Sequence, residues 1–414
     1  MTTQAGSGHV VVVGAGQAGG EIVAALRQGA FPGAITVIGE ESHYPYSRPP
    51  LSKTYLKGST SADDLLLRGQ EVYERNDIDV RTSTCVVSVD PAGRAVTLTD
   101  GETVPYDHLV LATGGRARTL PGLETARNAH YMRTRSDADA LRSRMAPARR
   151  AVVVGGGYIG LEFAAVARTL GVETVVVEVA ERLLARVSSP VVADFYRRQH
   201  EQQGVEILVD SGVDEFDPDD RGDVTAVRLA GGRSVPADFL VIGIGLLPRT
   251  ELAESAGLDV DTGILVDDRM RTSDPHIYAI GDVARFVDPR SGSYRRLESV
   301  PNATEQAKVA AASILGRPRS YEALPWFWSD QYDLKLQVAG VLEHGDDLVI
   351  RGDPSSDRSF MVLHLNGDRI RCAEVINDPA GFAAAKRLIA SDRPISVDVL
   401  RDTATPLKHA LTSA

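Results

Sequence analysis

Two short glycine-rich motifs have the residue types and spacing that bind a dinucleotide. The first is Gly14-x-Gly16-x-x-Gly19, directly after the apolar run 9–13. In such a motif the first glycine allows a tight turn, the second lets the backbone approach a pyrophosphate, and the third lets the next helix pack against the strand. The helix N-terminus then offers free N–H groups to the phosphates. Glycines needed for packing alone are the alternative interpretation.

The second motif is a near copy of the first, about 140 residues later in the chain. It reads Gly155-x-Gly157-x-x-Gly160 and follows the apolar run 151–154. A single such motif is weak evidence, but each copy here also has a strand before it and a helix after it. The sequence therefore predicts two dinucleotide-binding βαβ units.

An acidic residue ends the strand predicted after each motif. Glu40 lies 24 residues after Gly16, with Glu41 as the neighbouring alternative, and Glu178 lies 21 residues after Gly157. A carboxylate at this place accepts hydrogen bonds from ribose hydroxyls. A 2′-phosphate about 4 Å from it would be repelled by on the order of 4 kcal/mol at an effective dielectric near 20. We therefore predict that the second site prefers NADH to NADPH.

Two arginines follow Glu178 on a segment that we expect to be helical. Arg182 and Arg186 each have the length and charge to reach a phosphate. Both could equally be solvated surface residues, and of the two we favour Arg186 as the ligand.

The elements that position the motifs alternate between strands and helices. Helices are expected over 19–28 and 161–170, and strands over 34–38, 109–112, 174–177 and 239–242. From residue 326 onward, short apolar runs at 334–338, 348–351 and 359–363 and a helical run at 381–390 predict a separate α+β domain. The last residues, 403–414, are expected to be loosely held.

Composition sets the outer limits of function. The 414 residues correspond to roughly three domains. A net charge of −11 argues against general nucleic-acid binding. The first nine residues lack the build of a secretory signal, and no apolar run is long enough to span a membrane. The expected compartment is the cytoplasm.

Cysteine and histidine usage excludes several chemistries. The two cysteines, Cys85 and Cys372, cannot form a disulfide framework, and we expect both to be buried structural residues. No metal-binding spacing occurs among the nine histidines. Two dinucleotide sites in one chain instead predict electron transfer between a tightly held flavin and an exchangeable nicotinamide.

The chain resembles ferredoxin reductases of the putidaredoxin reductase type, within the glutathione-reductase-like flavoproteins. The resemblance covers nearly the whole chain. It rests on residues 47–53 (SRPPLSK), 111–115 (LATGG), 155–162 (GGGYIGLE), 279–282 (AIGD), 298–302 (ESVPN) and 326–331 (WFWSDQ). The cysteine pair of the disulfide reductases in this superfamily is missing from 44–53.

The resemblance implies an α/β fold with two Rossmann-like domains and an α+β C-terminal domain. A discontinuous FAD-binding domain would comprise 1–115 and 247–325. The NADH-binding domain would be 116–246, and the C-terminal domain 326–414.

The resemblance also implies roles for single residues. Lys53, beside the flavin N5 edge, would pair with Glu162, and both would be catalytic. The helix that begins near Val300 would point its N-terminus at the flavin, and Trp328 would shield the flavin from solvent. The implied FAD ligands are Gly14, Gly16, Ala18, Gly19, Glu40, Arg48, Pro49, Lys53, Val86, Thr113, Gly114, Arg133, Asp282, Val300 and Trp328. The implied NAD ligands are Gly155, Gly157, Ile159, Gly160, Glu178, Arg186 and Gly245; no metal is implied.

The implied activity is NADH:ferredoxin reduction. Hydride would pass from NADH to the flavin N5, and single electrons would pass to a [2Fe–2S] ferredoxin that supplies a cytochrome P450 or a ring-hydroxylating oxygenase. Because such ferredoxins are usually acidic, docking needs a local basic patch. Its candidates are Arg295, Arg296, Lys308, Lys335 and Lys408, any of which can also be scattered surface charge.

Other functions stay open at this stage. The acceptor can be rubredoxin or monodehydroascorbate; nitrite is disfavoured because the chain lacks iron–sulfur or siroheme-type cysteine motifs. A third class is an interaction protein like apoptosis-inducing factor, in which NADH switches assembly. Neither nucleic acid nor membrane is expected as a partner.

Overall fold

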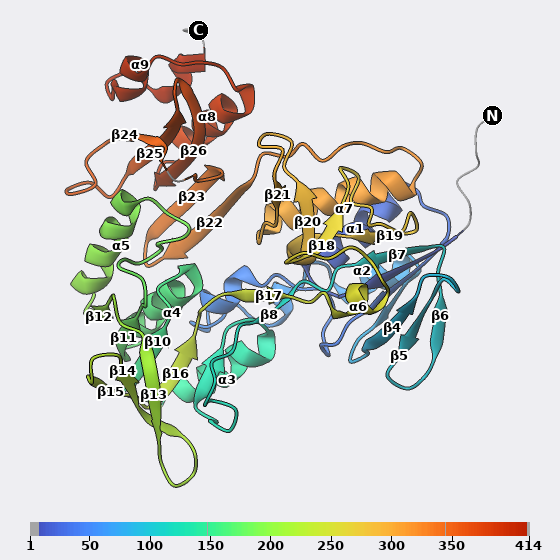
Figure 1. Ribbon diagram of the computed structural model, residues 1–414, viewed down its shortest axis with the longest axis horizontal. Coiled ribbons are helices and arrows are strands. Elements are labelled where there is room, and N and C mark those ends of the chain that lie inside the picture. Colours follow the sequence, from blue (N-terminus) through green and yellow to red (C-terminus); the bar gives the residue numbers. More distant parts are fainter. Residues whose placement is uncertain (1–7, 147, 344, 412–414) are drawn as a thin grey trace. The chain divides into compact units, whose positions relative to one another are not determined.

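The computed structural model describes residues 8–146, 148–343 and 345–411 (Figure 1). These residues form two compact units. The first holds the described residues up to 48 together with 61–116 and 246–323, and the second holds 49–60, 117–245 and 324 onward. The chain changes unit five times, and two of these changes fall within β8 (Gly115–Ala117) and at the start of β17 (Leu246–Pro248), two short strands that pair with each other.

A five-stranded parallel sheet forms the centre of the first unit, in the order β19-β7-β1-β2-β3. Its strands are β1 (His9–Val13), β2 (Ala34–Ile38), β3 (Ile78–Arg81), β7 (His108–Leu111) and β19 (Ile277–Ala279). Consecutive valines of β1 are fully buried, as expected for a parallel strand with both faces covered. Val13 pairs with Ile38 and with Leu111, so three strands end together where the first glycine motif begins.

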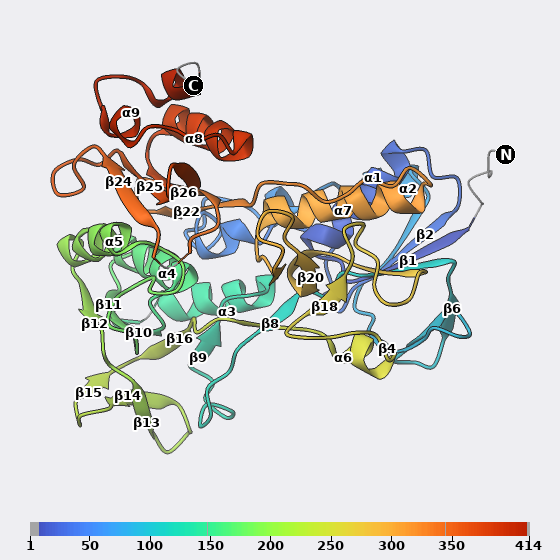
Figure 2. The same ribbon diagram turned by 45° about the horizontal axis from the view of Figure 1, so that its top comes forward.

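Two helices pack against each other in the first unit. They are α1 (Gln17–Gln28) and α7 (Val300–Ile314), which lie side by side in Figure 2. The smaller elements are α2 (Gln70–Arg75), α6 (Glu251–Ser255), the antiparallel sheet of β4 (Val86–Asp90), β5 (Ala95–Leu98) and β6 (Thr103–Pro105), and the sheet of β18 (Ile264–Val266), β20 (Ala284–Val287) and β21 (Tyr294–Arg295).

The second unit repeats the design around β10, which carries the second motif. Its parallel sheet has the order β12-β11-β10-β16-β9. The strands are β9 (Ala129–Tyr131), β10 (Arg150–Val154), β11 (Glu173–Val177), β12 (Val205–Leu208) and β16 (Phe239–Ile242). The helices are α3 (Arg135–Met145), α4 (Tyr158–Thr169) and α5 (Pro190–Gln202), and β13 (Val213–Pro218), β14 (Val224–Leu229) and β15 (Ser234–Pro236) form a small antiparallel sheet.

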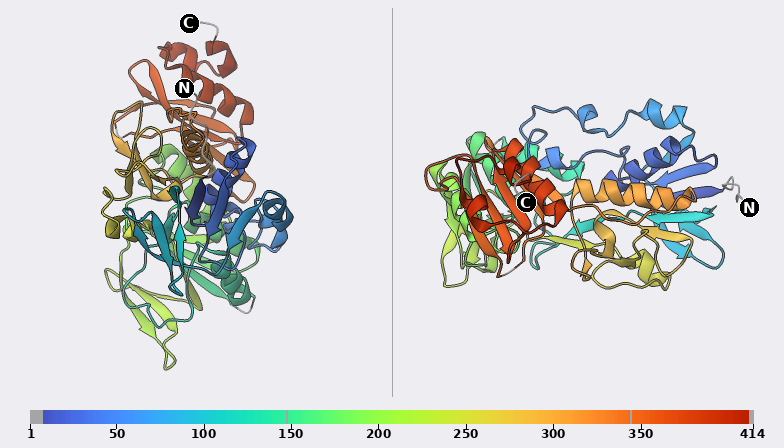
Figure 3. Two further views of the ribbon diagram at one scale, coloured as in Figure 1. Left: turned by 90° about the vertical axis from the view of Figure 1, so that its right-hand side faces the viewer. Right: turned by 90° about the horizontal axis from the view of Figure 1, so that it is seen from above.

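An antiparallel sheet in the order β22-β23-β26-β25-β24 completes the second unit. Its strands are coloured orange to red in Figure 3. Its strands are β22 (Trp326–Gln331), β23 (Leu334–Gly340), β24 (Asp347–Arg351), β25 (Phe360–Asn366) and β26 (Arg369–Ile376). One face packs against α8 (Pro379–Ser391), with α9 (Val397–Arg401) nearby. The other face shares a core with α4 and α5, where Leu336 and Phe360 lie among Phe163 and Phe195.

A short segment, Pro49–Thr60, packs with the second unit although its sequence neighbours belong to the first. Leu56 lies in the core with Leu141, and the Tyr55 hydroxyl donates to Asp139 at 2.6 Å. The segment packs against α3 and α4. The expected domain division, which counts it in the FAD-binding domain, stays a prediction.

The predicted α/β fold class with two Rossmann-like units and an α+β C-terminal part is confirmed. The helices after the glycine motifs begin two or three residues earlier than expected, at Gln17 and Tyr158, because the second glycine of each motif is itself the N-cap.

Two local predictions were wrong. The segment 181–188 forms turns rather than a helix, with Leu184 in the left-handed region at φ 53°. The end of the chain was expected to be loosely held, but its described part packs against the C-terminal core. The short 3₁₀ helix Leu407–Leu411 buries Leu407 and Ala410 there. Residues 412–414 lie outside the described residues, and so do residues 1–7 of the nine N-terminal residues that lack the build of a secretory signal.

Candidate functional site

The first glycine motif has a shape that fits a pyrophosphate. Gly14 has φ +115°, a conformation that favours glycine. A Cβ on Gly19 would lie 2.0 Å from the Gly14 carbonyl oxygen, whereas a Cβ on Gly16 would meet nothing within 4 Å. Among the described residues no side chain caps α1 at Gly16, so the N–H groups of its first turn lack a capping side chain there. The motif thus combines an open cradle with free donors, as FAD binding requires.

The second motif repeats this geometry. Gly155 has φ +109°, and a Cβ on Gly160 would lie 2.2 Å from the Gly155 carbonyl oxygen. In the described part of the chain, the space beside Gly157 is open to 4 Å and no side chain caps α4 there. The residues of this motif therefore fit the pyrophosphate of NADH.

The second and third glycines of this motif, Gly157 and Gly160, should respond differently to substitution by alanine. Gly157→Ala fills open space, so we expect an unchanged melting temperature and NADH binding weakened at least about tenfold, because the methyl group displaces the pyrophosphate from the backbone. Gly160→Ala forces α4 away from the strand, so we expect destabilisation by about 1–3 kcal/mol. Thermal unfolding and NADH titration of both variants check this; equal melting temperatures would contradict it.

The two ribose-binding candidates have different surroundings. Glu178 accepts hydrogen bonds from the backbone N–H of Gly156 at 2.6 Å and of Ala180 at 2.8 Å, which hold its carboxylate beside the second motif. Glu40 forms an ion pair with Arg249 and stays about half exposed. The structure thus gives Glu178 a fixed orientation at the end of β11.

Glu41, the alternative to Glu40, is already engaged. Its carboxylate accepts from Arg48 and from the Tyr46 hydroxyl, both at 2.6 Å. Burial opposes the charge of Arg48, yet Tyr46, Glu41 and Asp282 together raise its pKa. Both glutamates are paired with an arginine, but Glu40 is the more exposed of the two and remains the candidate for the FAD ribose. Arg48 lies near Asp282 as a positive charge.

The two arginines that follow Glu178 have different surroundings. Arg182 donates to the backbone carbonyls of Leu183, Ala185 and Ser188, so it holds its own loop together. Arg186 is exposed, and its guanidinium lies 3.9 Å from the Cβ position of Gly245. This places it beside the end of β16, the neighbour of the motif strand.

Three of the remaining FAD candidates of the first unit, Thr113, Gly114 and Asp282, follow the carboxyl ends of its parallel strands β7 and β19. A Cβ on Gly281 would lie 3.0 Å from the Ala18 Cβ, so the loop that carries Asp282 closely approaches α1. The Thr113 hydroxyl donates to the Arg249 carbonyl at 2.8 Å. Gly114, with φ +62°, follows Thr113, and Val86 begins β4.

The predicted helix start at Val300 is also found. α7 begins there after the N-cap Ser299, whose hydroxyl accepts from the Asn302 N–H at 3.3 Å. Asn302 is itself fixed by the hydroxyl of Tyr321 at 2.7 Å.

A buried ion pair joins Lys53 to Glu162 in the second unit. The Lys53 Nζ lies 2.7 Å from the Glu162 Oε2, and the two side chains are 14% and 3% exposed. Ser52 and Ser329 each donate to this carboxylate at 2.6 Å, one to each oxygen. A buried charge persists only when it is paired and hydrogen-bonded, and Glu162 is both. The pair predicted from the resemblance is therefore formed.

The other candidates of the second unit lie on three elements. Pro49 begins the 3₁₀ helix Pro49–Ser52, and Lys53 donates to its carbonyl at 3.2 Å. Ile159 is 43% exposed in the first turn of α4. Arg133 is half-buried before α3 and donates its N–H to Asp137 at 3.1 Å.

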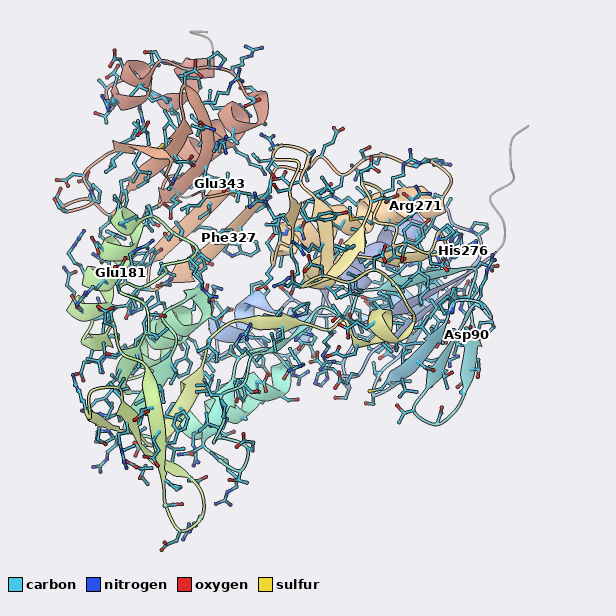
Figure 4. All side chains as sticks on the ribbon, in the orientation of Figure 1. Asp90, Glu181, Arg271, His276, Phe327 and Glu343 are labelled. Carbon is cyan, nitrogen blue, oxygen red and sulfur yellow. The ribbon has the colours of Figure 1, made fainter. Side chains whose placement is uncertain are left out.

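Trp328 is half-buried on β22, next to Phe327, which Figure 4 labels. Its ring lies 5.7 Å from that of Trp326. The shielding role of Trp328 toward a flavin stays a prediction.

One cysteine prediction was wrong. Cys372 is buried, as expected, but Cys85 is exposed, because it lies in the loop before β4 rather than within a core strand. Within the described residues no three His, Cys, Asp or Glu side chains form a metal-binding group. Over the same residues, no helix has the length and apolar character needed to cross a bilayer.

Sequence reasoning missed the residues that surround Glu162. Ser52, Ser329 and Gln331 all belong to the quoted motifs, but no role was derived for them. Period-two alternation along β22 puts Ser329 and Gln331 on one face, and that signal could have identified both.

Comparison with known proteins agrees with this geometry. Residues 8–307 match the family model of the pyridine nucleotide-disulphide oxidoreductases, and residues 326–411 match the reductase C-terminal model. Putidaredoxin reductase of Pseudomonas putida is 41% identical over 98% of this chain and 97% of its own length. The ferredoxin–NAD(+) reductase component of the anthranilate 1,2-dioxygenase system of Burkholderia cepacia is 41% identical over 97% of this chain and 98% of its own.

A solved structure gives the same result in three dimensions. The reductase in the covalent putidaredoxin reductase–putidaredoxin complex superposes with a TM-score of 0.96 at 40% identity, covering 98% of this chain and 99% of that one. With both glycine motifs formed and the match extending over the C-terminal sheet, the chain belongs to the pyridine nucleotide-disulphide oxidoreductase family, among its putidaredoxin reductase-type ferredoxin reductases.

Proposed function

We propose that the chain is an FAD-dependent NADH:ferredoxin reductase whose [2Fe–2S] ferredoxin serves a cytochrome P450 or a ring-hydroxylating oxygenase. The observation that carries the proposal is the presence of two complete pyrophosphate cradles in a chain that matches named ferredoxin reductases over nearly its whole length. The proposed compartment is the cytoplasm.

The first unit would hold FAD and the second unit NADH. In domain terms, 1–115 with 247–325 would bind FAD, 116–246 would bind NADH, and 326–414 would form the C-terminal domain. Bound FAD supplies the conversion between two-electron transfer from NADH and one-electron transfer to ferredoxin.

The residues of the chain then have separate tasks. The N–H groups at Gly16 and Gly157 would hold the two pyrophosphates, and the carboxylate of Glu178 would orient the NADH ribose. Lys53 and Glu162 form an ion pair with little exposed side-chain area. Such a pair is suited to orienting the carboxamide of the nicotinamide and to balancing the negative charge of the reduced flavin. No general acid or base is needed, because hydride transfer depends on positioning.

Docking of an acidic ferredoxin would use those candidate cations that are not neutralised within the chain. Arg295, Arg296 and Lys308 each have a carboxylate partner, at 3.2, 2.7 and 2.6 Å respectively. Within the described residues no ion pair engages Lys335 or Lys408. We therefore propose Lys335 and Lys408 as docking charges.

The test is NADH-driven cytochrome c reduction by the purified flavoprotein with and without a panel of [2Fe–2S] ferredoxins. A large ferredoxin-dependent stimulation is expected, and it should fall as ionic strength rises because exposed charges are screened. Lys335→Glu with Lys408→Glu should raise the KM for ferredoxin while leaving the bleaching of the flavin by NADH unchanged; Lys57→Glu, an exposed lysine elsewhere, is the control. Fast bleaching without stimulation by any ferredoxin would point to another acceptor.

A further inference from the structure

Glu162 does more than pair with Lys53, because it ends a row of buried hydrogen-bonding side chains. Ser329 lies 2.6 Å from its Oε1, and the Gln331 amide nitrogen lies 3.3 Å from the Ser329 hydroxyl. The Gln331 amide oxygen lies 2.8 Å from His200 Nε2, and the Tyr332 hydroxyl lies 3.2 Å from His200 Nδ1. Ser329, Gln331 and His200 are at most 1% exposed.

The direction of every bond in this row follows from the charge on Glu162. A carboxylate paired with a lysine only accepts, so the single Ser329 hydroxyl hydrogen must point to Glu162. The Ser329 oxygen can then only accept from Gln331, which turns the amide oxygen of Gln331 toward His200. His200 must therefore carry its hydrogen on Nε2, and its Nδ1 accepts from the Tyr332 hydroxyl.

We infer that Ser329, Gln331, His200 and Tyr332 form a one-way hydrogen-bonded chain, here the Glu162 chain, that positions the Glu162 carboxylate for Lys53. Each donor points toward the carboxylate, so the dipoles add. The four members act through Glu162 and are positioning residues. The inference rests on the proposed function only in assigning Lys53 and Glu162 to the reaction with NADH.

The protonation state of His200 agrees with this arrangement. Burial lowers the pKa of His200 to about 4, outweighing the opposite effect of its bond to Gln331. His200 is therefore neutral near pH 7 and can accept on one ring nitrogen while donating from the other. The row also links α5, which carries His200, to β22 and its hairpin turn, and through them to Glu162 on α4.

The first experiment determines the direction of the hydrogen bonds in the Glu162 chain and requires no catalytic turnover. In the FAD-loaded protein labelled with ¹⁵N-histidine, we expect the His200 ring to be neutral with its hydrogen on Nε2 from about pH 5 to pH 8. His200→Asn identifies its signal among the nine histidines. A hydrogen on Nδ1, or an imidazolium at pH 6, overturns the proposed direction.

The second experiment measures bleaching of the flavin by NADH in single turnovers. Ser329→Ala should slow it by about ten- to a hundredfold, the usual effect of losing one hydrogen bond to a buried charge. Tyr196→Phe is the matched control: the buried Tyr196 hydroxyl lies near Glu162 and has no hydrogen-bond partner among the described residues.

A double-mutant comparison separates positioning from a general structural effect. In a Lys53→Met background, Ser329→Ala should have no further effect on bleaching, because the carboxylate no longer has a lysine to orient. If Ser329→Ala fails to fold, Gln331→Met offers the same test one step further along the chain. Equal rates for Ser329→Ala and Tyr196→Phe would overturn the inference, whereas a parent protein that NADH does not bleach would overturn the proposed function and leave the histidine result standing.

Discussion

Replacing Lys53 with methionine should slow the bleaching of the bound flavin by NADH by about a hundredfold or more. The expected size is that of removing one positioned group that stabilises developing charge, about 2.7–4 kcal/mol, and each 1.36 kcal/mol is a factor of ten. Lys53 and Glu162 are 14% and 3% exposed, so little water is available to replace the lost partner. Stopped-flow measurement of the flavin absorbance checks the result.

Two controls separate chemistry from folding in that experiment. Lys57→Met changes an exposed lysine on the same segment and should leave the bleaching rate unchanged. The double variant Lys53→Met, Glu162→Gln removes the unpaired buried charge, so it should recover most of any lost stability while remaining slow. A bleaching rate for Lys53→Met equal to that of the parent protein would show that the pair is structural.

Much of the fold was predictable because its strongest signals are local. The valine runs of β1 and β10 and the glycines that follow them define strand, turn and helix within about fifteen residues of sequence. The close contacts of Gly19 and Gly160 with the preceding carbonyl oxygens are consequences of that local geometry. Consequently residue type and spacing were enough to predict both strand–turn–helix units.

The surroundings of Glu162 were not predictable in this way. Ser52 and Ser329 bond to Glu162, and His200 bonds to Gln331, each with a partner more than a hundred residues away in sequence. No local pattern specifies which parts of the polypeptide meet there. The same holds for the packing of Pro49–Thr60 on the second unit. Turn-forming segments such as 181–188 also escaped prediction, because their shape is set by backbone bonds such as that from Leu184 N–H to the Gly156 carbonyl.

Glu178 should give the enzyme a strong preference for NADH, and Glu178→Gln should remove most of it. The backbone bonds from Gly156 and Ala180 fix the carboxylate beside the second motif, so it cannot swing away from a 2′-phosphate. Repulsion between the two charges is about 4 kcal/mol at about 4 Å and an effective dielectric near 20, a factor of about a thousand. Glutamine keeps an oxygen that can accept from Gly156 but carries no charge.

The measurement is the ratio of kcat/KM for NADPH to that for NADH. We expect this ratio to rise by about a hundred- to a thousandfold in Glu178→Gln, partly because NADH loses charge-assisted bonds to its ribose. Glu181→Gln is the matched control: Glu181, labelled in Figure 4, is exposed on the same loop and should leave the ratio unchanged. A parent protein that prefers NADPH would refute the assignment of Glu178. An equal shift in both variants would instead mean that the overall charge of the loop, rather than one oriented carboxylate, selects the nucleotide.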